Sequence, residues 1–177
     1  IDPETLKVGY ETIDGEKPRG LCGSAIIDVT AEMLKAGIIG TSGRFNAELK
    51  TLRLRASGEA TEFVIAWKDE TSIGSDIVVT QNDVREVQLA KAAIHTGTVI
   101  LMKHMKVSPH EIQKVFIAGA FGNYVDPQSA RMIGMYPDVP LERVQFVGNT
   151  AGSGARMALL STKIQSLAEE VAKHIEY

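Results

Sequence analysis

The second half of the chain alternates short apolar runs with segments of helical spacing, and each apolar run ends in a glycine-rich loop. Residues 115–118 are followed by the loop 119–123, and residues 144–147 are followed by the loop 148–154. Short runs rich in Val, Ile and Phe favour strands, and glycine at a strand end allows a tight turn into a helix. This alternation constrains the chain to an α/β fold, in which ligands collect at the carboxyl ends of the strands.

Capping residues and apolar periodicity predict the helices. From Ser24 the apolar residues recur at helical spacing as far as Gly37, which stands where a C-cap glycine belongs. Thr80, with Asp83 three residues later, predicts the start of the longest helix, which the pattern extends to about Met105. The remaining helices are predicted from 108, from 126 to 132, over 151–160 and over 161–174.

The first half of the chain predicts strands and one irregular excursion. Residues 5–13 alternate loosely and predict a strand, while 62–67 and 76–80 are rich in Val and Ile and predict two paired strands. Residues 41–75 are predicted to form an irregular or hairpin excursion, because 41–60 are polar and have no clean period. The order of elements predicts a mixed sheet with helices on both faces and right-handed crossovers.

Composition excludes several classes of protein. With 177 residues, 44% of them apolar, we expect one soluble globular domain with a substantial core. A net charge of −3 gives no basic footprint for nucleic acid, and no apolar run reaches membrane-spanning length. The single cysteine, Cys22, cannot by itself hold an iron–sulfur cluster or a disulfide within the chain, and the four histidines show no metal-binding spacing. Ile1 begins no signal-peptide pattern, and we expect the chain to be a fragment of something longer.

Three glycine-rich segments, at 20–24, 119–123 and 148–154, precede predicted helices. Glycine lets a ligand approach the backbone, and the N–H groups of a helix N-terminus attract phosphate. Together the segments predict a nucleotide site, although each glycine could instead serve only a tight turn. Neither a P-loop nor a G-x-G-x-x-G fingerprint occurs in the chain.

Four stretches resemble the C-terminal region of the reductive activators of corrinoid proteins. They are GLCGSAIID at 20–28, TQNDVREVQLAKAAI at 80–94, IAGAFGNYVDP at 117–127 and VGNTAGSGA at 147–155. The resemblance implies an actin-like ATPase fold, the ribonuclease H-like α/β half-fold of the ASKHA class, with residues 1–177 as its C-terminal subdomain. It also implies an ATP-dependent activity that returns Co(II) corrinoid proteins to Co(I) for methyl transfer in anaerobic metabolism.

The resemblance also implies roles for particular residues. The nucleotide-binding candidates are Gly20, Gly23, Ser24, Lys91, Gly119, Ala120, Phe121, Gly122 and Asn123, with His95 as a further candidate beside Lys91. The candidates for a hinge between the halves of the fold are Gly148, Asn149, Ala151, Gly152 and Gly154. Lys91 could equally be an ordinary solvated lysine. We expect a positive φ at Gly119, and we expect the loops 20–24 and 119–123 to open into one cleft.

The phosphate loops of the superfamily, each built on Asp-x-Gly, have no match in this chain. We therefore expect the magnesium-binding aspartates and the iron–sulfur domain to lie outside it, so the intact protein would use ATP, Mg²⁺ and a cluster that this chain cannot provide alone. No catalytic residue can be named, and we expect the isolated chain to be inactive. The resemblance implies a corrinoid protein as partner and a cytoplasmic location, and it leaves a homodimer open.

Two alternative functions remain at this stage. One is a non-catalytic docking or dimerisation module of such an activator, and the other is a fragment of another actin-like kinase, such as a sugar kinase. Cys22 lies in a glycine loop at a predicted helix start, where the thiol pKa could be lowered. We expect instead a buried cysteine that serves packing.

Overall fold

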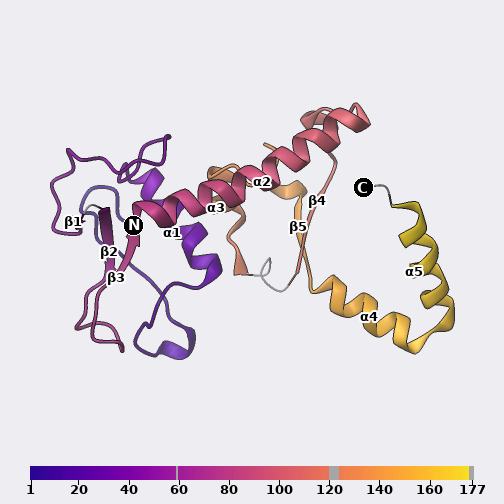
Figure 1. Ribbon diagram of the computed structural model, residues 1–177, viewed down its shortest axis with the longest axis horizontal. Helices are drawn as coiled ribbons and strands as arrows, with labels where there is room; N and C mark the ends of the chain where they lie inside the picture. Colours follow the sequence, from indigo (N-terminus) through magenta and orange to yellow (C-terminus); the bar gives the residue numbers. More distant parts are fainter. Residues whose placement is uncertain (59, 120–123, 176–177) are drawn as a thin grey trace. The chain divides into compact units, whose positions relative to one another are not determined.

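The computed structural model describes residues 1–58, 60–119 and 124–175, and the chain forms two compact units. Unit 1 comprises Ile1–Ile112 and Val125–Leu141, and unit 2 comprises Gln113–Tyr124 and Glu142–Tyr177. Unit 1 holds helices α1, α2 and α3 and strands β1, β2 and β3, whereas unit 2 holds strands β4 and β5 and helices α4 and α5 (Figure 1).

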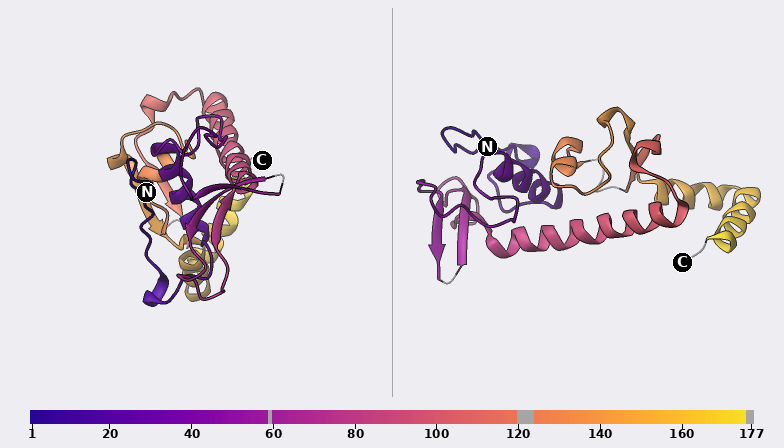
Figure 2. Two further views of the ribbon diagram at one scale, coloured as in Figure 1. Left: turned by 90° about the vertical axis from the view of Figure 1, so that its left-hand side faces the viewer. Right: turned by 90° about the horizontal axis from the view of Figure 1, so that it is seen from above.

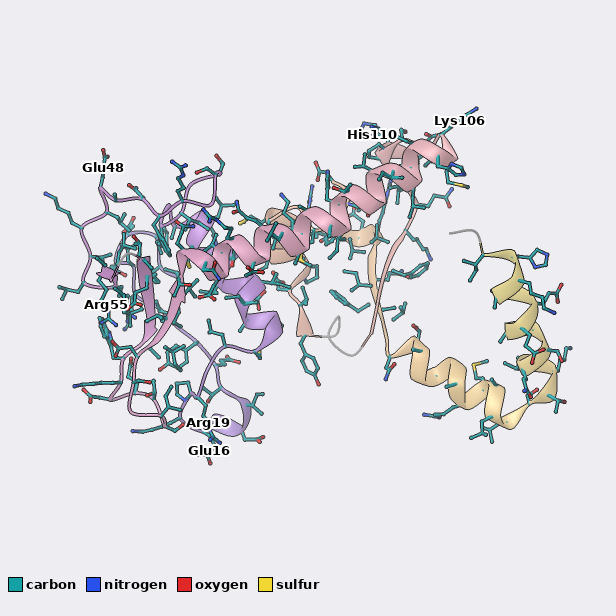
Figure 3. All side chains as sticks on the ribbon, viewed as in Figure 1. Glu16, Arg19, Glu48, Arg55, Lys106 and His110 are labelled. Atoms are coloured by element: carbon teal, nitrogen blue, oxygen red, sulfur yellow. The ribbon has the colours of Figure 1, made fainter. Side chains whose placement is uncertain are left out.

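Unit 1 contains a three-stranded antiparallel sheet in the order β1-β2-β3. Strands β2 (Ala60–Ala66) and β3 (Ile77–Thr80) are the two paired strands that the sequence predicts. Strand β1 (Leu54–Ser57) forms the edge and follows a long irregular stretch. Figure 3 labels Arg55 on this edge strand, where its guanidinium pairs with Glu62 and Asp76, each at 2.8 Å.

The core of unit 1 forms between this sheet and helix α1 (Gly23–Lys35). Phe63 of β2, Val79 of β3 and Met33 of α1 are fully buried in one apolar cluster. Helix α1 has Ala36 as its C-cap, and the next residue, Gly37, has a φ of 68°, as expected for a glycine that ends a helix.

Helix α2 (Gln81–Met105) follows β3 directly and is the predicted long helix (Figure 2). The predicted capping box is present, because the Thr80 side chain accepts from the Asp83 N–H while the Asp83 carboxylate accepts from the Thr80 N–H. The short helix predicted from 108 is a single 3₁₀ turn (Pro109–Glu111), and helix α3 (Pro127–Met132) begins after Asp126 as predicted. Within the described residues, no helix is long and apolar enough to cross a membrane.

Unit 2 contains the parallel strands β4 (Val115–Ala118) and β5 (Val144–Gly148), followed by α4 (Thr150–Leu160) and α5 (Thr162–His174). These elements agree with the sequence prediction. The expectation that the first of these strands is buried is wrong, because half-buried and exposed side chains alternate along β4 and Phe116 is 59% exposed. A pair of strands offers too little surrounding structure to bury both of its faces.

Two further expectations differ from the structure. Residues 5–13 form no strand, because Leu6 takes a left-handed φ of 55° and no neighbouring strand of the described chain pairs with this segment. Leu6 and Val8 nevertheless pack against the core, which accounts for the apolar alternation. The strands also form two separate sheets in place of one mixed sheet, since β3 and β4 belong to different units and β4 pairs with β5.

Candidate nucleotide-binding site

In unit 2 the carboxyl ends of β4 and β5 meet at two glycines. Gly119 has a φ of 106° and Gly148 a φ of 70°, so the positive φ predicted at Gly119 is confirmed. The Gly119 N–H donates a hydrogen bond of 2.7 Å to the Gly148 carbonyl, which holds the two strand ends together. No atom of the described residues lies within 4 Å of the place that a Cβ on Gly119 would occupy. Glycine is the residue that this backbone conformation favours, and nucleotide contact at Gly119 stays a prediction.

Gly119 is the first of five nucleotide-binding candidates in the loop 119–123, which the resemblance identifies as the adenosine loop. The other four, Ala120, Phe121, Gly122 and Asn123, lie outside the described part of the chain. The loop 20–24 belongs to unit 1, whereas Gly119 belongs to unit 2. The expectation that the two loops open into one cleft therefore stays a prediction.

The predicted hinge residues form the end of β5 and the first turns of α4. Asn149 is the N-cap of α4, and its side-chain oxygen accepts a hydrogen bond of 2.9 Å from the Gly152 N–H. A Cβ on Gly152 would lie only 3.0 Å from the Asn149 amide nitrogen, so a small residue suits this turn. Ala151 is exposed, and a Cβ on Gly154 would meet no described atom within 4 Å. Close helix crossing at these residues stays a prediction.

In unit 1 Gly20 lines a pocket of about 290 Å³ in front of α1. The same pocket is lined by Leu21, Cys22, Tyr10 and Ile65, together with Glu16 and Arg19, which Figure 3 labels on the loop before α1. Gly23 and Ser24 are the first two residues of α1. The N-terminal end of a helix therefore stands beside a mixed apolar and charged pocket.

Cys22 is the N-cap residue of α1 and is exposed, so the expectation of a buried packing cysteine is wrong. Its Sγ lies 3.3 Å from the Ser24 Oγ. The hydrogen bond from Ser24 and the N–H groups at the start of α1 lower the pKa of the Cys22 thiol. A cap position places a side chain outside the helix, which explains the exposure.

Lys91 lies on α2 between two pockets of unit 1. One pocket, of about 240 Å³, is also lined by Thr30 and Gln88, and the other, of about 690 Å³, is also lined by His95 and Arg131. A Cβ on Gly134 would lie 3.3 Å from the Lys91 ammonium nitrogen. Lys91 therefore lines two hollows, and Gly20 lines neither of them.

The pocket of about 690 Å³ is also lined by polar side chains that the sequence did not connect with Lys91. Arg131 of α3 donates to Asp138 through Nε and Nη2, at 3.0 and 2.7 Å. The Tyr136 hydroxyl donates to the Pro127 carbonyl, and burial raises the pKa of this phenol. These residues follow Lys91 by about forty positions, and no local spacing pattern links them to α2. Within the described residues, no group of three or more His, Cys, Asp and Glu side chains could hold a metal ion.

The parallel strands β4 and β5 with glycines at their carboxyl ends, and helix α4 after β5, form an α/β arrangement, and in sheets of this kind ligands typically bind at the carboxyl edge. The whole chain, residues 1–177, matches the family described as the C-terminal domain of RACo, the ASKHA domain. The chain therefore belongs to this family, which confirms the actin-like α/β fold class and the resemblance on which it was predicted.

Relatives with known names agree with this assignment. The chain is 36% identical over 183 residues to the corrinoid activation enzyme RamQ of Eubacterium limosum, covering 98% of this chain and 31% of the relative. It is 27% identical to the [Co(II) methylated amine-specific corrinoid protein] reductase of Methanosarcina barkeri, covering 99% of this chain and 28% of the relative. A solved reductive activator for corrinoid, iron-sulfur protein superposes with a TM-score of 0.90 at 38% identity, covering 97% of this chain and 27% of that one. The chain thus spans less than a third of these relatives.

Proposed function

We propose that this chain is the C-terminal, ATP-binding part of an ATP-dependent reductive activator that returns Co(II) corrinoid proteins to Co(I) for methyl transfer. The observation that carries the proposal is the match of almost the whole chain, at 38% identity and a TM-score of 0.90, to a solved reductive activator. In this proposal the magnesium ligands, the phosphate loops and the iron–sulfur cluster belong to the remainder of the protein. The partner is a corrinoid protein, and the protein works in the cytoplasm of an anaerobe.

Within this proposal the nucleotide contacts the strand edge of unit 2 at Gly119 and the loop that follows it, residues 120–123. The open Cβ position and the positive φ at Gly119 support this placement. Gly148 and the first turn of α4 act as the hinge. In unit 1 the proposal assigns nucleotide contact to Lys91, which lines two pockets, to Gly20 in the loop before α1, and to Gly23 and Ser24 at the start of α1.

The test is an anaerobic assay with the intact protein that carries this chain, a corrinoid protein in the Co(II) state and a low-potential reductant. We expect conversion of Co(II) to Co(I), followed by visible absorbance, only when Mg-ATP is present. A non-hydrolysable ATP analogue serves as the control. Reduction at the same rate without ATP, or transfer of phosphate to a sugar, would contradict the proposed function.

The chain by itself is expected to bind ATP weakly, because its sequence carries none of the Asp-x-Gly phosphate loops. Micromolar affinity corresponds to about −8 kcal/mol, more than contacts to one purine loop usually provide. Calorimetric titration of Mg-ATP into residues 1–177 and into the intact protein measures the difference. Micromolar binding and turnover by the isolated chain would show that the phosphate ligands lie within it.

A further inference from the structure

A turn of unit 1, residues 42–45, is locked against α2 by two glutamine side chains. The Gln81 amide donates to the Gly43 carbonyl at 2.8 Å and accepts from the Phe45 N–H at 3.2 Å. The Gln88 amide donates to the Ser42 carbonyl at 3.1 Å. Gly43 is buried with a φ of 77°, and a Cβ there would lie 2.4 Å from the Gln88 Nε2. The position of this turn relative to α2 is therefore set by several independent contacts.

The turn and α2 together form a pocket of about 580 Å³ that carries two arginines, Arg44 from the turn and Arg85 from α2. The complete lining is Ser42, Arg44, Phe45, Thr61, Gln81, Arg85 and Gln88. It contains no carboxylate, in a chain whose net charge is −3. We call it the cationic pocket, because its lining is positively charged although the chain as a whole has a net negative charge.

The two guanidinium groups are not neutralised within the described part of the chain. Arg44 and Arg85 are exposed, and neither side chain has an ion-pair or hydrogen-bond partner among the described residues. Asp83 bonds Thr80 in the capping box and Glu62 pairs with Arg55, and the exposed Glu86 beside Arg85 on α2 forms no ion pair with either arginine among the described residues. Two like charges held beside one hollow favour an anionic occupant.

We propose that the cationic pocket docks an acidic segment of a protein partner. The planar guanidinium fork matches a carboxylate, and arginine together with aromatic residues such as Phe45 is typical of protein interfaces. A small-molecule site would bury most of its ligand, whereas both arginines here are open to solvent. The proposed function assigns no role to Arg44 or Arg85, so this docking surface goes beyond it.

The test measures the fluorescence anisotropy of a labelled oligoglutamate peptide titrated with the intact protein at low salt. Because each exposed charge pair contributes little, we expect Arg44→Gln and Arg85→Gln each to weaken binding by about two- to fivefold, and the double variant to weaken it further. Added salt should weaken the wild-type interaction, since both arginines are exposed. Arg85→Lys, which keeps the charge without the fork, should retain part of the affinity.

The matched control is Lys103→Gln, which removes one exposed positive charge from the same helix outside the pocket. It should leave peptide binding unchanged, and equal thermal melting of all variants shows that they are folded. Equal binding by the double variant, or no binding by the wild type, would overturn the proposal. Inorganic phosphate that binds through both arginines where the peptide does not would assign the pocket to a small anion instead. No ATP or corrinoid protein is used, so the result is independent of the proposed function.

Discussion

The two units of this chain differ in how they bury apolar side chains. Within the described residues, every buried side chain belongs to unit 1, where Phe63, Met33 and Val79 are fully enclosed. In unit 2 large apolar side chains are exposed, among them Phe116 at 59%, Leu159 at 85% and Leu160 at 84%. Elements with good local signals can therefore form without a core of their own.

Sheet type explains much of this difference. The antiparallel sheet of unit 1 buries side chains against α1, and an antiparallel sheet tolerates one solvated face. A parallel sheet is normally covered on both faces, and two strands provide little surface for such packing. Unit 1 should consequently resist unfolding more strongly than unit 2 when the chain is studied by itself.

The largest expected effect separates the two units directly. Phe63→Ala removes a fully buried ring and should lower the free energy of unfolding of unit 1 by about 3–5 kcal/mol. Phe116→Ala removes the same side chain from an exposed position and should cost much less. Denaturant unfolding of both variants measures the difference, and equal losses would mean that unit 2 has an apolar core after all.

The next effect concerns glycines with positive φ. Gly119→Val should introduce backbone strain of about 1–3 kcal/mol, since a β-branched residue resists a φ of 106°, while a Cβ there overlaps no atom of the described residues. If the proposed function holds, ATP affinity and ATP-dependent corrinoid reduction by the intact protein should also fall, because the new side chain would occupy the space that the proposal gives to the nucleotide. Electron transfer from an artificial donor to the iron–sulfur cluster that the proposal places in the rest of the protein should persist.

Gly74→Val is the matched control for this variant. Gly74 has a φ of 68°, and at Gly74 as at Gly119 no described atom lies within 4 Å of the place a Cβ would occupy, but Gly74 lies in the loop between β2 and β3. It should show similar strain with unchanged ATP affinity, measured by calorimetry on the folded protein. Unchanged ATP affinity in Gly119→Val would contradict the assignment of nucleotide contact to Gly119.

A smaller effect compares the helix caps of the two units. Thr80→Ala removes the cap of α2 and should cost about 1 kcal/mol of stability, whereas Thr80→Ser keeps the hydroxyl and should restore it. Asn149→Ala removes the cap of α4, whose residues are not buried, and should lower helicity with little effect on the main unfolding transition. Circular dichroism during denaturation follows both, and a large shift of that transition by Asn149→Ala would show that the units unfold together.

The smallest effect depends on pH and tests the packing of α1 against α3. Burial raises the pKa of Asp28, and the nearby Asp126 and Glu32 carboxylates raise it further, although a hydrogen bond from Ser129 opposes them. Its Oδ1 is buried without a hydrogen-bond partner among the described residues. Because the folded state then holds the proton more tightly than the unfolded state, stability falls as pH rises through the raised pKa.

Asp28→Asn should therefore raise the melting temperature at neutral pH and have no stabilising effect at low pH, where the wild-type carboxyl is protonated in both states. Melting curves across this range provide the measurement. The same gain at every pH would show that charge at Asp28 is not the cause, and Asp126→Asn, which keeps a capping side chain, is the partner variant for a double-mutant comparison.

Local signals in the sequence determined most of the helices and strands of this protein. Each of these signals spans only a few residues, because capping hydrogen bonds and φ preferences act over that range. Examples are the Thr80–Asp83 capping box, Gly37 after α1, and the apolar runs before Gly119 and Gly148. The same local reasoning predicted the positive φ at Gly119. Four motifs in order were also sufficient to indicate the family.

Only the tertiary structure decided which strands pair, which side chains are covered and which distant residues meet. Residues 5–13 have the apolar alternation of a strand, but no strand of the described chain pairs with them. Cys22 was predicted to be buried, but it is exposed at the N-cap of α1. Arg131 lines the same pocket as Lys91, and Arg44 lines the same pocket as Arg85, because segments far apart in the chain pack together. Burial and pairing depend on non-local contacts, which no short stretch of sequence specifies by itself.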